Sequence, residues 1–156
     1  MTIEWAKLLQ ENRKEILDGW VKRELLLFSG KMAPHSPVAE AFSEALEMVL
    51  DHCEKNSELL TEALVQVSRI LAVQDLPPSR SLSLFFELKR MIQEISVRGG
   101  QKKSLKQGEL DALQCRLEEI TLQAFDCYMM HREKIAQLKV DENKRHHFMQ
   151  LRRAEG

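Results

Sequence analysis

The chain has 156 residues, enough for one domain with a substantial core but not for two. Charged residues make up 30% of it and balance to a net charge of −1, which excludes the surplus of basic residues typical of many nucleic-acid-binding proteins. No apolar run approaches the length of a membrane span and the first residues lack the pattern of a signal peptide, so we expect a cytoplasmic protein without membrane insertion.

The first part of the chain predicts one long helix, from about Thr2 to Phe28. Proline and glycine then disfavour a continued helix, so we expect a loop over residues 29–37. The apolar residues of this first helix gather on one face: Trp5, Leu8, Leu9, Ile16, Trp20 and Leu27.

Two further helices are predicted on either side of a short link at Asn56 and Ser57, and so short a link favours antiparallel packing. The outer face of the earlier helix is acidic, which indicates a solvated surface or a surface for a partner. Five carboxylates share that face within about 80° of arc: Glu40, Glu44, Glu47, Asp51 and Glu54.

The prolines at positions 77 and 78 predict a helix boundary, because a residue before proline avoids helical dihedral angles. Pro78 fits the first turn of a fourth helix, where its missing N–H is not needed. This helix is apolar on two sides: Leu84, Phe85, Leu88, Met91, Ile92 and Ile95 form one face, whereas Leu82, Phe86 and Val97 point nearly the opposite way. The pattern favours either burial at the centre of the domain or a shared interface with a second copy.

After Gly99 and Gly100, the sequence predicts a basic loop and then a much longer last helix. Its apolar residues keep the three- and four-residue spacing of a coiled coil over about 42 Å: Leu110, Leu113, Leu117, Ile120, Ala124, Tyr128, His131, Ile135 and Leu138. The end of the chain is polar and basic, so we expect it to project or fray. We accordingly expect one helical domain over residues 1–143 and a tail over residues 144–156.

These elements predict an all-α bundle of five helices with a long C-terminal helix. The three cysteines, Cys53, Cys115 and Cys127, have neither disulfide nor zinc spacing, and we interpret them as reduced packing residues. No histidine follows a glutamate by three positions, and no phosphate-binding loop or nucleophile motif is present. We therefore expect no enzyme activity, no catalytic residues, no metal and no cofactor.

Three stretches carry a family resemblance: "LLQENRKEILDGWVKREL", "VQDLPPSRSLSLFFELK" and "AFDCYMMHREKIAQLKVDENKR". In this order they resemble the N-terminal domain of the RsbRD-type co-antagonists of the kinase RsbT. The resemblance implies a globin-like sensor domain without haem that dimerises and signals through its last helix to a STAS domain. The chain contains no STAS domain, so the resemblance implies a stand-alone sensory or docking module.

His131 is the histidine that lies on the apolar side of the last helix, one turn from Tyr128. A hydrogen-bonded imidazole in the core or in an interface is the simplest interpretation, and an axial ligand of a cofactor is the sharper alternative. The second apolar side of the fourth helix and the apolar face of the last helix together give the candidate interface residues: Leu82, Phe86, Val97, Tyr128 and His131.

Charge is unevenly distributed along the chain. Residues 40–62 hold seven acids against one base, whereas residues 98–106 carry four bases and residues 131–156 carry a net charge of +3. This asymmetry can orient a protein partner or order a dimer, although solvated helix faces would explain it too. The basic tail shows neither the interleaving of aromatic with basic residues nor the recognition-helix turn expected of a nucleic-acid-binding segment.

We therefore predict a non-catalytic signalling module that forms a homodimer and contacts a protein partner, such as a STAS-domain protein or a kinase. The alternative is a helical cofactor-binding protein that serves a respiratory or redox electron-transfer system. The visible spectrum of the purified protein would discriminate between the two.

Overall fold

The structure is a computed structural model that describes residues 4–28, 33, 35–74, 76–100 and 104–155. All of its regular elements are helices, which confirms the predicted all-α class for the described residues. The helices are α1 (Glu4–Glu11), α2 (Arg13–Leu26), α3 (Pro37–His52), α4 (Glu58–Ala72), α5 (Pro78–Leu82), α6 (Leu84–Arg98) and α7 (Gln107–Glu155).

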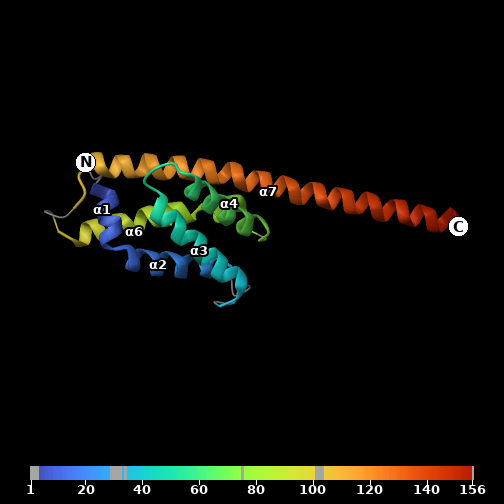
Figure 1. Ribbon diagram of the computed structural model, residues 1–156, viewed down its shortest axis with the longest axis horizontal. Helices are drawn as coiled ribbons and strands as arrows, with labels where there is room; N and C mark the ends of the chain where they lie inside the picture. The colour runs from blue at the N-terminus through green and yellow to red at the C-terminus, as the bar shows by residue number, and fades with distance from the viewer. Residues whose placement is uncertain (1–3, 29–32, 34, 75, 101–103, 156) are drawn as a thin grey trace.

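The bundle is arranged around α4 and α6, which pack against α7 on one side (Figure 1). On the other side, α3 packs on α4 and α2 packs on α6, and α2 and α3 contact each other. α7 runs along the whole bundle and then continues well beyond it. The globin-like arrangement stays a prediction.

The predicted first helix is interrupted at Asn12, so a single helix from Thr2 to Phe28 was wrong. The backbone of Asn12 leaves helical geometry at φ −116° and ψ 20°. Its side-chain Nδ2 donates to the carbonyl oxygen of Leu8 at 2.9 Å, a local hydrogen bond that competes with helix continuation. The break separates α1 from α2, and residues from both helices enter the core.

Serine residues begin α3 and α4. Ser36 Oγ accepts from the N–H of Ala39 at 3.2 Å, and Ser57 Oγ accepts from the N–H of Leu60 at 3.1 Å. Each bond satisfies a backbone donor that the first turn of a helix leaves unpaired. The two helices begin close to the predicted positions. The first-turn residues Val38 and Leu59 are exposed.

The predicted fourth helix is divided at Ser83 into α5 and α6. Pro78 opens α5 as expected, and Ser83 Oγ then donates to the carbonyl oxygen of Arg80 at 2.7 Å. Because of this break, Leu82 does not share a helix with Phe86, and it is buried. The predicted common outer face of Leu82, Phe86 and Val97 was therefore wrong. The breaks at Asn12 and Ser83 together turn the five predicted helices into the seven helices of the described residues.

Polar contacts hold α7 and α2 against the bundle. Ser68 Oγ on α4 donates to the carbonyl oxygen of Ala124 at 3.1 Å, and Arg132 donates to that of Ala72 at 2.9 Å. Trp20 Nε1 on α2 donates to the carbonyl oxygen of Leu84 at 2.9 Å. Each bond gives a side-chain donor a partner at a contact between helices, where packing removes the donor from water.

Candidate interaction surfaces

α7 buries one face in the bundle, which we call the inner seam. Its residues are Leu113, Leu117, Ile120, Ala124 and Tyr128, all of them buried as predicted. His131 and Ile135 are half-buried, and Leu138 is 68% exposed, so the prediction that Leu138 continues this packing was wrong. The inner seam thus ends near Ile135, and every residue from Ala136 to Glu155 is exposed.

A second face of α7 carries another row of apolar residues, which we call the outer seam. It consists of Leu122, Phe125, Met129, Ala136 and Val140, and all five are exposed. At 100° per residue these side chains lie within about 60° of arc, centred about 135° around the helix from the inner seam. A row of exposed apolar side chains at coiled-coil spacing is typical of a helix that pairs with another helix.

The sequence already contained the signal for the outer seam. Leu122, Phe125 and Met129 are spaced by three and four residues, as are the residues of the inner seam. Periodicity alone therefore predicts two apolar faces on this part of the helix. The predicted apolar face of this helix did not include the outer seam.

The structure divides the candidate interface residues into two groups. Tyr128 is buried within one chain, like Leu82, so neither is accessible to a partner in this conformation. Phe86 and Val97 are 53% and 75% exposed, on the outer side of α6. They lie eleven residues apart, about 16 Å along the helix, so the apolar surface they offer is sparse.

His131 is half-buried on α7, one turn after Tyr128. Its pKa is lowered, first by burial and then by the positive charges of Arg69 and Lys134. A lowered pKa favours the neutral imidazole near pH 7. Within the described ranges, no three histidine, cysteine, aspartate or glutamate side chains cluster as metal ligands would.

The cysteines occupy three different environments. Cys53 is buried, and burial raises the pKa of its thiol to about 11. Cys127 is half-buried, and burial also raises its pKa. Cys115 is exposed on α7, so our interpretation of this residue as a buried packing residue was wrong.

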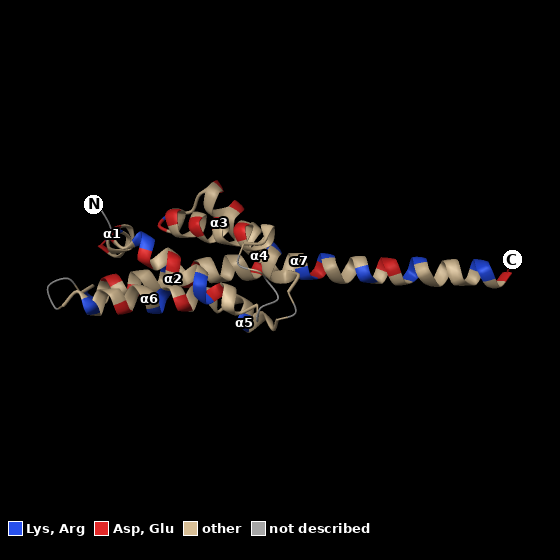
Figure 2. Cartoon of the chain, turned by 90° about the horizontal axis from the view of Figure 1, so that it is seen from below, with Lys and Arg blue, Asp and Glu red and all other residues tan. Residues whose placement is uncertain are grey.

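Part of the acidic face of α3 is neutralised by a neighbouring helix. The guanidinium of Arg13 donates from Nε to Asp51 Oδ1 at 2.6 Å and from Nη2 to Glu47 Oε1 at 2.5 Å. This contact lowers the pKa of the Asp51 carboxyl. Glu40 and Glu44 remain exposed nearer the start of the helix. Figure 2 shows the row of acidic residues along α3, and basic residues interspersed with acidic ones along the far end of α7.

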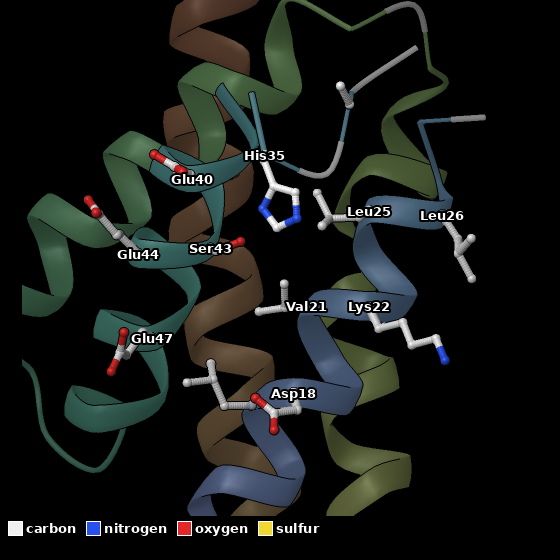
Figure 3. Close-up of a pocket in the computed structure, with 12 residues that line it drawn as sticks. Asp18, Val21, Lys22, Leu25, Leu26, His35, Glu40, Ser43, Glu44 and Glu47 are labelled. Carbon is white, nitrogen blue, oxygen red and sulfur yellow. The ribbon is translucent and has the colours of Figure 1, made fainter. Parts of the chain in front are cut away.

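A groove of about 800 Å³ lies between α2 and α3 (Figure 3). Leu17, Val21 and Leu25 of α2 form its apolar side, one helical turn apart from each other. Glu40, Glu44 and Glu47 stand along α3, and His35 lies at one end between the two helices. The groove is on the side of the bundle away from α7. The sequence analysis did not identify it, although the four-residue spacing on α2 was visible.

Buried polar atoms mark two further points of the core. Glu24 on α2 is 1% exposed, and its Oε2 has no hydrogen-bond partner among the described residues. Burial, and then the negative charge of Glu87, raise the pKa of Glu24 to about 8, against the opposing effect of Arg23. The hydroxyl of Tyr128 is likewise buried without a partner in the described chain.

No helix among the described residues has both the length and the apolar composition that crossing a membrane requires. Comparison with known proteins gives one family match. The sequence profile of the family described as "RsbT co-antagonist protein rsbRD N-terminal domain" matches residues 14–142. The chain is also 32% identical over 139 residues to an uncharacterized protein of Archaeoglobus fulgidus, a match that covers 85% of both chains. No solved structure matches the chain.

Proposed function

Because the chain belongs to the family of RsbT co-antagonist rsbRD N-terminal domains, we propose that it is a non-catalytic signalling module that works as a pair of identical chains. The outer seam of α7 is the observation that carries this proposal. Two copies that pack their outer seams together would bury apolar side chains that a single copy leaves in water. The resemblance of the three quoted sequence stretches to this family supports the same sensor-like role.

The length of α7 supports a role in transmitting a signal. Its 49 residues extend about 72 Å at 1.5 Å per residue, and only the part up to about Ile135 contacts the bundle. A change in how two such helices pack would therefore be carried to their free ends. A ligand or partner shifts this arrangement only if it binds one packing more tightly than the other.

The partner that fits this proposal is a STAS-domain protein or a kinase, to which the free ends of α7 would pass the signal. The described residues offer no observation that favours the electron-transfer alternative over this one. His131 is half-buried on α7 and does not line the groove between α2 and α3, which is lined mainly by carboxylates and aliphatic side chains, with His35 at one end. We therefore carry the signalling function forward alone.

The proposal is tested by placing a charge on the outer seam. Phe125→Glu would leave the fold intact, because Phe125 is exposed in the single chain, and would put an unpaired carboxylate into the contact between copies. We expect dimerisation to weaken by about 2 kcal/mol or more, measured by sedimentation equilibrium.

Leu138→Glu is the matched control for this experiment. Leu138 is 68% exposed on the same helix but lies about 140° around it from Phe125. The same charge at this position should leave dimerisation unchanged. Equal behaviour of the two variants, or a wild-type chain that stays monomeric at high micromolar concentration, would refute pairing through the outer seam.

A further inference from the structure

The groove between α2 and α3 has an apolar side that the packing of α2 creates. α2 carries two neighbouring apolar stripes: Ile16 and Trp20 are buried in the core, whereas Leu17, Val21 and Leu25 are half-buried along the groove. The side chains of Val21 and Leu25 are visible between the two helices in Figure 3. The groove is therefore an apolar trough that the single chain leaves partly open to water.

The rim of this trough is predominantly acidic. Asp18, Glu40, Glu44 and Glu47 line it together with Lys22 and His35, and the carboxylates of Glu40 and Glu44 point toward the outer side of α3 (Figure 3). Arg13 pairs with Glu47, but in the part of the chain that the structure describes no ion pair involves Glu40 or Glu44. Apolar surface beside unpaired carboxylates favours an occupant with an apolar stripe flanked by positive charges.

The chain itself contains a helical segment of this description. Lys144, Phe148 and Arg152 follow one another at four-residue spacing near the end of α7, and Leu151 lies beside Phe148. All four are exposed, and the guanidinium carbon of Arg152 lies 5.9 Å from the centre of the Phe148 ring. This part of α7 thus presents an apolar pair between two basic side chains.

We propose that the groove between α2 and α3 receives the distal end of α7 from a second copy of the chain. The lengths agree, since Lys144 and Arg152 are about 12 Å apart along their helix and the apolar side of the groove, from Leu17 to Leu25, is about 12 Å long. The contact must come from another copy, because α7 is one continuous helix that leaves the bundle on the side away from the groove (Figure 1). About 30 Å of α7 lies beyond Ile135 and is long enough to reach into a neighbouring molecule.

This contact is separate from the outer seam. It uses the distal residues of α7 and the opposite side of the bundle, so it joins molecules whether or not their outer seams are paired. Because the donor and the acceptor surfaces differ, the contact is heterologous, and repetition of it would build particles larger than a dimer unless it closes.

A charge swap tests the proposal in the full chain. One variant, Glu40→Lys with Glu44→Lys, reverses the groove, and the other, Lys144→Glu with Arg152→Glu, reverses the distal helix. All four residues are exposed, so both proteins should fold. Each variant alone should show about tenfold weaker formation of the groove contact in sedimentation velocity at low salt.

An equal mixture of the two variants should recover the association of the wild type, because the reversed groove then meets a reversed helix and the unchanged groove meets an unchanged one. Glu58→Lys with Glu62→Lys, two exposed acids of α4 outside the groove, is the matched control and should associate like the wild type. The series is run with and without Phe125→Glu, so that loss of the outer-seam pair is distinguished from loss of the groove contact.

Three outcomes would overturn the proposal. Unchanged association of either charge-reversed variant would show that its surface is not used. A mixture that fails to recover would show that the two surfaces do not meet. A groove variant that loses association while the distal-helix variant keeps it would assign the groove to a different occupant, such as another basic helix.

Discussion

Glu24 places a carboxyl group on the stripe of α2 that also carries Ile16 and Trp20. Burial raises its pKa to about 8, well above its ordinary value of 4.5, because the charged form is desolvated there and faces the negative charge of Glu87. Between these two pH values the folded chain holds a proton that the unfolded chain releases. The free energy of unfolding must therefore fall as the pH rises from about 4.5 to about 8 and level off above that.

Glu24→Gln should remove this dependence, since an amide of similar size carries no charge to desolvate. We expect the variant to gain about 1 to 3 kcal/mol relative to the wild type between pH 5 and pH 9, measured by urea unfolding at both values. Glu62→Gln, a change at an exposed position of α4, should leave the pH profile of the wild type unchanged. Parallel profiles for the wild type and Glu24→Gln would show that the buried carboxyl does not titrate as described.

The burial of residues such as Glu24 could not be predicted from the sequence. Its spacing from Ile16 and Trp20 places it on the buried face, but a carboxylate is almost always assigned to the surface. Cys115 shows the converse case, because free cysteine is usually buried and this one is exposed. In both cases the neighbouring helices decide the environment, and a single sequence does not specify how they pack.

Among the elements, the positions and caps of α3 and α4 were predictable, because serine, proline and regular apolar spacing act locally. The breaks at Asn12 and Ser83 were not, because each depends on a side-chain hydrogen bond that competes with a helix whose pattern could continue. The outer seam and the groove were predictable only in part. Their spacings were present in the sequence, but only the packing shows that they remain uncovered.

The distal part of α7 is an element that contributes no packing to its own bundle. Deletion of residues 144–156 should therefore change the free energy of unfolding by less than about 1 kcal/mol, since every described residue there is exposed. The same deletion should abolish the groove contact and weaken capture of a protein partner. Thermal unfolding and partner binding measured on one truncated protein check both statements, and a collapse of the melting temperature would show that this segment stabilises the bundle.

For the whole molecule, the burial of the predicted interface residues changes which surface we propose for the dimer. The sequence assigned the homodimer to the fourth and last helices through Leu82, Phe86, Val97, Tyr128 and His131. Leu82 and Tyr128 are in the core, and the exposed apolar surface of α6 is sparse. We therefore place the interface of the proposed dimer on the outer seam of α7. The expectation of a dimer is kept as a proposal, with a different set of contact residues.

Site-specific photo-cross-linking tests this central claim most directly. A benzoylphenylalanine at position 125 should give covalent dimers whose cross-linked peptide, identified by mass spectrometry, lies on α7 of the second copy. The same group at position 97, on the exposed side of α6, should give none above background. Dimers from position 97 without dimers from position 125 would contradict pairing through α7 and return the interface to the fourth predicted helix.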